Sequence, residues 1–365
     1  MNRCKVQEIA ELITKGTTPT TLGFSYIDEG INFVKIESID ANGKFDKTKF
    51  AHISEECHVS LKRSKLQKND ILFSIAGAIG RTAIVSEDIL PANTNQALAI
   101  IRLKKNNNDL NFIRYQLSSA SVIKQTEKQK QGVAQLNLSL KDIGNLEINV
   151  PSLPEQKKIA SHLDTIQSAI DNKKQQLTAL DEMVKSKFVE MFGEKDFPTK
   201  NWDDVFITKT GKLDSNAMVE DGMYPFFTCA KEIFAINDYA FDQEALLLAG
   251  NNAAGKYDVK YYKGKFNAYQ RTYVLSLKEN WSYRLFQFQL EDKLLYLKDQ
   301  SKGINTKFLT LKILQTLSFI VPPNDLQDEF TAYVEKIDSA KSIIKTQLND
   351  LNELLESKMD FYFGE

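Results

Sequence analysis

The fold is decided by residues 150–194, which read VPSLPEQKKIASHLDTIQSAIDNKKQQLTALDEMVKSKFVEMFGE. A similar stretch occurs 171 positions later, where residues 321–365 read VPPNDLQDEFTAYVEKIDSAKSIIKTQLNDLNELLESKMDFYFGE. The two segments align without a gap from the Val-Pro start, through Gln156 and Gln327, to the Phe-Gly-Glu end. Self-similarity at a fixed offset is the signature of an internal repeat. We therefore expect one structural unit to occur twice.

The repeat continues upstream into the blocks that precede these segments. At the same offset, the matching positions are Gly132 with Gly303, Leu138 with Leu309 and Leu146 with Leu317. Earlier in the chain the offset becomes 174, and there Asn93 matches Asn267 and Gln96 matches Gln270. The change falls in a loop at residues 105–108, which is shorter in the second copy. Because the likeness extends beyond the terminal segments, the whole unit is duplicated.

Each copy ends in a long amphipathic helix. Its apolar residues recur at alternating steps of three and four, which is the spacing of a coiled-coil seam. The expected seam residues are Ile159, Leu163, Ile166, Ile170, Leu177, Leu180 and Val184 in the first helix, and Phe330, Val334, Ile337, Ile344, Leu348, Leu351 and Leu355 in the second. From residue 155 to 192 such a helix is about 57 Å long. We expect the two helices to pack antiparallel as a spacer; the alternative is that each packs only on its own block.

The blocks before the helices have the pattern of mixed α/β domains. Short β-branched runs bounded by Gly, Asn and Asp predict strands, and Asp109 is placed to cap a helix that continues to Leu117. The expected strands cover residues 31–36, 71–75, 82–85 and 97–103 in the first block and 245–249, 259–262 and 272–277 in the second, where a helix follows over 282–297. We therefore predict a mixed α/β fold with a pseudo-twofold internal repeat: globular blocks at 1–150 and 195–320, and helices at 151–194 and 321–365.

Composition narrows the class of protein. With 365 residues, 42% hydrophobic and 26% charged, the chain is long enough for about two globular domains. No apolar run approaches the roughly 20 residues that a bilayer requires, and residues 1–16 lack a signal-peptide core. The cysteines are Cys4, Cys57 and Cys229, an odd number without CxxC spacing, which excludes a disulfide framework and fits a reducing cytoplasm.

The net charge of −1 hides an uneven distribution. Residues 1–150 carry 20 basic and 16 acidic side chains, whereas residues 321–365 carry 4 basic and 10 acidic ones. A polyanion suits the weakly basic blocks, and a protein partner suits the acidic helix.

Two stretches of the second copy suggest chemistry. Residues 250–256 match the GxxxxGK part of a phosphate-binding loop, but Tyr257 follows where Ser or Thr is needed, and a strand pattern stands where a helix should begin. We expect a Gly-rich turn. Residues 256–265 interleave four lysines with three tyrosines, which suits nucleic acid and equally suits a solvated edge strand.

Catalytic and metal sites are not indicated. His52, Cys57 and His58 lack an evident fourth ligand, and no triad, carboxylate motif or cofactor loop occurs in both copies. An approximate internal dyad matches the local dyads of duplex DNA, and two diverged copies would meet two different stretches of it.

The chain resembles the specificity (S) subunits of Type I restriction-modification systems. The resemblance rests on the two Val-Pro…Gln helix starts, on residues 16–19 (Gly-Thr-Thr-Pro), on Gly77, Gly80 and Arg81, and on Asn95-Gln96. It implies two target-recognition domains that each read half of a split DNA sequence, and spacer helices that dock two methyltransferase subunits. It implies that this chain is not an enzyme, and that S-adenosylmethionine and ATP with Mg²⁺ belong to partner subunits. Whether restriction motor-endonuclease subunits join stays open.

We expect DNA contacts from residues of the motifs and basic stretches above. They are Thr17, Thr18, Lys62, Arg63, Lys65, Arg81, Lys128, Lys130, Gln131, Gln135, Lys256, Tyr257, Lys260, Tyr262, Lys263 and Lys302. One departure from the family pattern stands out, because the second copy has only Gly211-Lys212-Leu213 where the first has residues 16–19. The alternative functions are a coiled-coil scaffold whose globular ends bind proteins, and an ATP-using enzyme built on residues 250–256.

Overall fold

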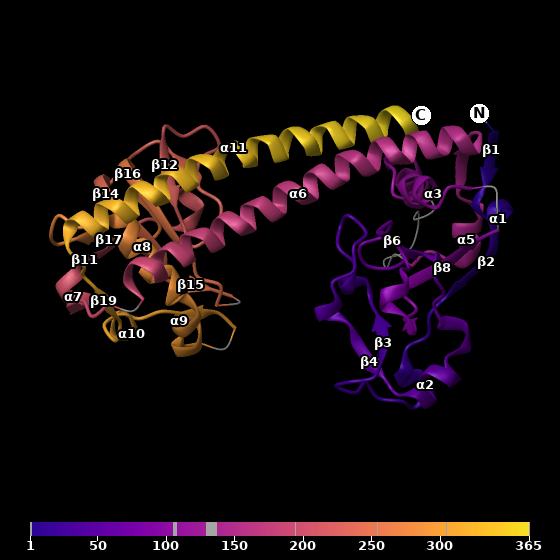
Figure 1. The fold of residues 1–365 in the computed structure, drawn as a ribbon, viewed down its shortest axis with the longest axis horizontal. Helices are drawn as coiled ribbons and strands as arrows, with labels where there is room; N and C mark the ends of the chain where they lie inside the picture. Colours follow the sequence, from indigo (N-terminus) through magenta and orange to yellow (C-terminus); the bar gives the residue numbers. More distant parts are fainter. Residues whose placement is uncertain are drawn as a thin grey trace. The chain divides into compact units, whose positions relative to one another are not determined.

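The computed structural model describes residues 2–104, 108–128, 137–193, 195–253, 255–303 and 305–364. The chain forms two compact units, and Figure 1 shows the elements of each. Unit 1 comprises Met1–Lys174 and Thr346–Glu365, and unit 2 comprises Gln175–Lys345. Each unit contains a mixed α/β globular part together with segments of two long helices, α6 (Leu153–Phe192) and α11 (Asn324–Phe363).

Unit 1 is built on a four-stranded sheet of order β2-β8-β5-β6 and a three-stranded sheet of order β4-β3-β7, while β1 pairs with β9. Its strands are β1 (Asn2–Lys5), β2 (Ala10–Lys15), β3 (Ile31–Val34), β4 (Ala51–Ile53), β5 (Ile71–Ser74), β6 (Thr82–Ile84), β7 (Ala92–Thr94), β8 (Leu98–Leu103) and β9 (Glu147–Val150). Its shorter helices are α1 (Val6–Ile9), α2 (Glu55–Ser60), α3 (Leu110–Leu117), α4 (Ala120–Lys128) and α5 (Leu140–Asn145).

Unit 2 has one six-stranded sheet of order β11-β17-β14-β16-β12-β13, with the small pairs β10-β19 and β15-β18 beside it. Its strands are β10 (Thr199–Asn201), β11 (Phe206–Thr210), β12 (Tyr224–Phe227), β13 (Phe234–Ile236), β14 (Phe241–Ala249), β15 (Asn251–Asn252), β16 (Val259–Ala268), β17 (Thr272–Leu277), β18 (Lys307–Phe308) and β19 (Ser318–Ile320). Its shorter helices are α7 (Trp202–Val205), α8 (Tyr283–Asp292), α9 (Leu294–Gln300) and α10 (Leu311–Leu314).

The two units share one strand order, which confirms the predicted repeat. The order β2-β8-β5-β6 corresponds to β11-β17-β14-β16, and the parallel pair β3-β7 corresponds to the parallel pair β12-β16. Phe33 pairs with Asn93 in the first, and Phe226 pairs with Asn267 in the second. The single long strand β16 thus takes the place of both β6 and β7, so unit 2 has one sheet where unit 1 has two.

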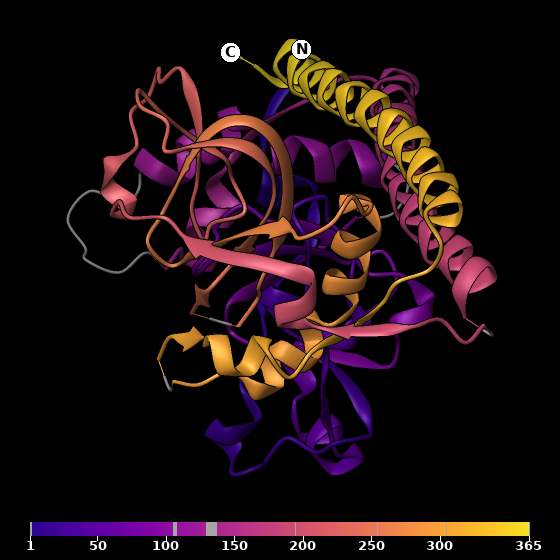
Figure 2. The ribbon, with the colours of Figure 1, turned by 90° about the vertical axis from the view of Figure 1, so that its left-hand side faces the viewer.

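The long helices pack antiparallel within each unit. In unit 1, Ile159 and Leu163 near the start of α6 join a core cluster with Leu355 and Met359 near the end of α11. In unit 2, Val184 near the end of α6 joins a cluster with Phe330 and other residues near the start of α11. Figures 1 and 2 show the two helices side by side. The predicted antiparallel pairing is therefore confirmed.

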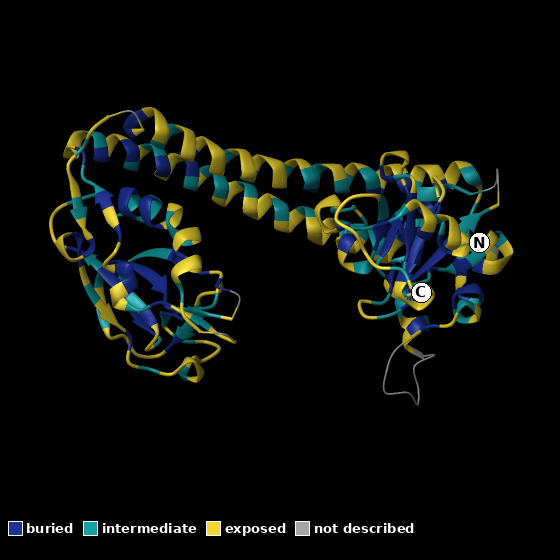
Figure 3. Ribbon diagram, turned by 90° about the horizontal axis from the view of Figure 1, so that it is seen from below, coloured by how far each residue is buried: buried dark blue, intermediate teal, exposed yellow. Residues whose placement is uncertain are grey.

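The seam residues lie on the inner faces of the helices. Leu163, Ile170, Val184, Phe330, Val334 and Ile337 are buried, and the other eight predicted seam residues are partly buried. Burying such a side chain contributes about 1.5–3 kcal/mol, so the seam is a substantial part of each unit's stability. Figure 3 shows buried residues gathered on the sheets and exposed residues along the outer helix faces.

Each predicted strand corresponds to an observed one, namely β3, β5, β6, β8, β14, β16 or β17, and the four of the first block are one or two residues shorter than predicted. Helix α3 begins where expected, because the Asp109 carboxylate accepts the Phe112 amide at 2.9 Å. The helix predicted over residues 282–297 is two helices, α8 and α9, which meet at Lys293. Among the helices that the structure describes, none has the length and apolarity needed to cross a membrane.

Candidate nucleic-acid interface

A glycine anchors the loop that follows β2 in unit 1. The Gly16 amide donates to the Leu98 carbonyl at 3.3 Å, and the Thr17 amide donates to the Thr94 carbonyl at 3.1 Å. A Cβ at Gly16 would lie 2.0 Å from the Thr94 carbonyl oxygen, so no larger residue fits without moving the backbone. The Thr18 hydroxyl in turn bonds the side-chain carbonyl of Gln96. This close approach places Thr17 and Thr18 beside the turn that carries Gln96.

The corresponding loop of unit 2 has the same anchor. The Gly211 amide donates to the Thr272 carbonyl at 3.3 Å, and the Gln270 amide donates to the Leu213 carbonyl at 2.9 Å. A Cβ at Gly211 would lie 1.8 Å from the Ala268 carbonyl oxygen. The absence of the Thr-Thr-Pro residues that follow Gly16 therefore does not change how the glycine of this loop is attached. It changes the side chains that the loop presents.

Beside the Gly211 loop lies a basic hollow that the sequence analysis did not single out. A cavity of about 670 Å³ is lined by Lys209, Lys212 and Tyr273 among others, and a smaller cavity of about 160 Å³ shares Tyr273 and adds Gln270 and Arg271. Lysine and arginine bind phosphate, and glutamine and arginine can read base edges. The signal available in the sequence was the match of Gln96 with Gln270 in the repeat.

The buried Asn93 holds a basic turn in unit 1. Its side-chain amide donates to the Leu61 carbonyl at 3.1 Å and to the Ser64 hydroxyl at 3.0 Å, and it is fully buried. The turn between these partners carries Lys62 and Arg63, whose side chains are exposed. Lys65, which follows, is partly buried. Asn267, the repeat counterpart, donates to the Asp238 carbonyl at 3.1 Å.

The Arg81 side chain hydrogen-bonds to backbone groups of unit 1. Its Nη1 donates to the carbonyls of Ile36 at 3.3 Å and Ile39 at 2.7 Å. The Ser74 hydroxyl accepts the Arg81 amide at 2.7 Å and so closes the glycine turn before it. Arg81 therefore supports the local fold, and its role towards DNA stays a prediction.

The lysine–tyrosine stretch of unit 2 lies mostly in β16, which pairs with β14 along Phe241–Phe266 to Leu248–Val259 and with β12 only at its last two residues. The strand is therefore an edge over most of its length. Tyr262 packs against Phe227 and Phe266 in the core, and Tyr257 is 7% exposed. Tyr257 and Tyr262 thus take part in packing, Tyr262 as a partly buried residue, and their contact with nucleic acid stays a prediction.

The lysines of this stretch differ in their availability. Lys260 donates to the Ala230 carbonyl at 2.9 Å and pairs with Asp258, while Lys263 pairs with Glu244 at 3.1 Å. The Lys256 side chain is exposed, and so is Lys302, whose backbone bonds Phe308 in both directions. The turn after Gly250 leads into β15 and β16 instead of a helix, which agrees with the strand pattern predicted there.

Four predicted contact residues cannot be placed. Lys130, Gln131 and Gln135 lie outside the described residues, and only the backbone of Lys128 is described, at the end of α4. In the described part of the chain, no three His, Cys, Asp or Glu side chains gather as a metal ion would require. Cys57 is buried, and His58 bonds the Asn93 side chain.

Two α/β domains of one topology, each packed on a pair of long helices and each with a glycine-anchored polar loop, define a duplicated recognition protein. The family model of the Type I restriction modification DNA specificity domain matches residues 1–182 and 194–353. The chain belongs to this family, which confirms the resemblance seen in its sequence.

Known proteins of this class are similar to the chain. The Type I restriction enzyme EcoDI specificity subunit of Escherichia coli is 35% identical over 167 residues, which cover 44% of this chain and 35% of that protein. The EcoBI specificity subunit of the same species is 34% identical over 153 residues, or 41% of this chain and 31% of that protein. The chain thus spans about a third of the length of these curated relatives.

The fold also has a solved counterpart. The crystal structure of the Type I restriction-modification system S subunit from M. genitalium matches with a TM-score of 0.61 at 16% identity, over 98% of this chain and 94% of that one. At this identity the likeness concerns the fold.

Proposed function

We propose that this chain reads a bipartite, asymmetric sequence in duplex DNA, one half-site with each unit. The supporting observation is that the two units share one fold, while the loops anchored by Gly16 and Gly211 carry different side chains. Gly16 and Gly211 make equivalent attachments, but Thr17 and Thr18 follow the first glycine whereas Lys212 follows the second. Side chains of different types recognise different base edges, so the two half-sites differ.

The chain recruits the catalytic subunits rather than performing the chemistry. Two methyltransferase subunits dock on the helices, where residues 321–365 carry 10 acidic and 4 basic side chains. S-adenosylmethionine is bound by those partners, and ATP with Mg²⁺ by restriction motor-endonuclease subunits where these join the complex. The naming of the relatives as specificity subunits supports this division of labour, and such a complex works in the cytoplasm.

The proposal is tested by binding and modification together. The chain is purified with its methyltransferase partner, and binding to a random duplex library is measured across a range of salt concentrations. The proposal predicts selection of a split sequence and a steep salt dependence, because each phosphate contact releases counterions. Indifference to DNA, with the methyltransferase still bound, would favour a coiled-coil scaffold instead.

A further inference from the structure

The globular part of unit 1 is fastened to one face of α6 by polar contacts. The first is made by Gln156, which is 1% exposed. Its Oε1 accepts the Asp109 amide at 2.8 Å, and its Nε2 donates to the Pro151 carbonyl at 2.9 Å. The contact ties the start of α3 to the first turn of α6.

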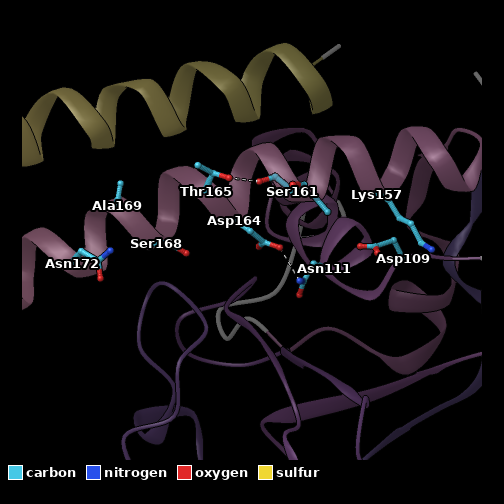
Figure 4. Close-up of a pocket in the computed structure, with 10 residues that line it drawn as sticks. Asp109, Asn111, Lys157, Ser161, Asp164, Thr165, Ser168, Ala169 and Asn172 are labelled. Atoms are coloured by element: carbon cyan, nitrogen blue, oxygen red, sulfur yellow. Dashed lines mark hydrogen bonds between the residues drawn. The ribbon is translucent and has the colours of Figure 1, made fainter.

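The second contact is made by Asp164, eight residues further along α6 (Figure 4). Its Oδ2 accepts Asn111 Nδ2 at 2.9 Å, and its Oδ1 accepts the Tyr115 hydroxyl at 2.8 Å. Tyr115 is 4% exposed, and its burial raises the pKa of the hydroxyl, which therefore remains a donor at neutral pH. Both partners belong to α3.

The third contact joins a different loop to the same helix. Asp171 forms an ion pair with Lys44, and its side chain is 20% exposed. The same loop is tied to α3, because Arg114 Nη1 donates to the Asn42 carbonyl at 3.3 Å. Two separate parts of the globular domain thus reach α6.

The spacing of these three contacts along α6 fixes the orientation of the globular part of unit 1 relative to that helix. With a rise of about 1.5 Å per residue, Gln156, Asp164 and Asp171 are spread over about 22 Å of helix, and steps of eight and seven residues keep them on one face. A single attachment would act as a pivot, whereas separated attachments resist rotation of the domain about α6. We name Gln156, Asp164 and Asp171 the α6 clamp.

Unit 2 fastens its own globular part to α11 in the same manner. Gln327 accepts the Ser282 amide at 2.9 Å and donates to the Pro322 carbonyl at 2.7 Å. Thr331 bonds the Ser282 hydroxyl, and Asp338 pairs with Arg284 of α8. The first contact is identical in both units, and the later ones use different side chains for the same purpose.

We propose that the α6 clamp sets how strictly the gap between the two half-sites is read, which rests on the proposed bipartite function. Each added base pair moves the second half-site by about 3.4 Å and rotates it by about 35°, since a turn holds 10–10.5 base pairs. A rigidly held domain accepts one gap, while a domain free to swivel accepts its neighbours. Asp164 is thus a positioning residue for gap length and not a reader of bases.

The test uses the complex of this chain with its methyltransferase. Methylation rates are measured on the DNA site selected by the wild type and on sites whose gap is one base pair longer or shorter. For Asp164→Ala, we expect the preference for the correct gap to fall at least about tenfold, with unchanged base preference in both half-sites. The matched control is Thr165→Ala, since the Thr165 hydroxyl bonds only the Ser161 carbonyl of its own helix in the part described.

Unchanged gap preference in Asp164→Ala would overturn the clamp, and so would altered base preference. Tyr115→Phe, which removes one bond, decides the case if Asp164→Ala melts below the assay temperature; a smaller loosening is then expected, and none would overturn the clamp. If the wild type itself fails to methylate a split site, the proposed function fails first, and the two failures are thus distinguishable.

Discussion

Gln156 and Gln327, 171 positions apart, make the same two hydrogen bonds, each within its own unit. Each side-chain oxygen accepts a hydrogen bond from the backbone amide of an N-cap residue, Asp109 of α3 or Ser282 of α8. Each side-chain nitrogen donates to the carbonyl of a proline just before its own long helix, Pro151 or Pro322. Both glutamines are 1% exposed. The repeat therefore preserves the joint between globular domain and helix.

Replacing Gln156 by Leu should lower the free energy of unfolding by about 1–3 kcal/mol, because the partly buried Asp109 amide and Pro151 carbonyl would both lose the hydrogen bond to its side chain. Urea denaturation of the purified chain measures the loss. Gln176→Leu, on an exposed position of the same helix, is the control and should change stability by under about 0.5 kcal/mol. Equal effects of the two changes would show that the bonds contribute nothing.

Gly16→Ala should weaken recognition of the first half-site and leave the second intact, since the new Cβ would collide with the Thr94 carbonyl. Gly211→Ala should do the reverse through the Ala268 carbonyl. Competition binding with each half-site randomised in turn checks this, with Thr20→Ala and Asn216→Ala as exposed controls nearby. Loss of both half-sites in either variant would argue against independent readers.

Arg271→Gln should weaken binding to the second half-site and reduce the slope of log affinity against log salt by about 0.9 if the guanidinium contacts one phosphate. The reason is the place of Arg271 beside Gln270 at the glycine-anchored loop. Titrations at several salt concentrations give the slope. Lys278→Gln, exposed just after the far end of β17, serves for comparison. An identical slope in Arg271→Gln and the wild type would remove Arg271 from the interface.

Ionisation of the Tyr261 hydroxyl should lower the free energy of unfolding at alkaline pH. Burial, and then the hydrogen bond to Glu244, raises the pKa of Tyr261 to about 12 from 10.0. The folded chain therefore holds this proton more tightly than the unfolded chain, so the stabilisation is complete below pH 10 and is lost as the pH rises towards 12. Unfolding free energies measured across this window should fall less steeply in Tyr261→Phe than in Tyr296→Phe, which alters an exposed ring. Parallel curves would contradict the assignment.

The sequence predicts the repeat, the long helices and their antiparallel pairing, because period and offset are properties of the chain itself. It also places Asp109 at the start of α3, since capping depends on neighbours in sequence. The sequence does not predict that unit 2 has the single strand β16 where unit 1 has the two strands β6 and β7. The reason is that strand continuity depends on pairing partners that are distant in sequence.

The candidate site is less visible in the sequence than the fold. The alternation of lysine and tyrosine suggested contact groups, but Tyr257 is buried in the core and Tyr262 packs against it while partly buried. The Arg81 guanidinium is bound by the Ile36 and Ile39 carbonyls. Side-chain type does not reveal such tertiary partners. Arg271, by contrast, becomes a candidate contact residue only in the folded chain, because folding brings the Gly211 loop against residues 268–272.

The central claim is that each unit reads one half of a split target. Its most direct test is to map methylated bases in the DNA of cells that produce this chain with its methyltransferase partner. The account predicts one motif of two different half-sites with a fixed gap, and a change in only the first half-site when residues 1–150 are exchanged for those of a relative. A continuous motif, or a change in both half-sites after that exchange, would contradict it.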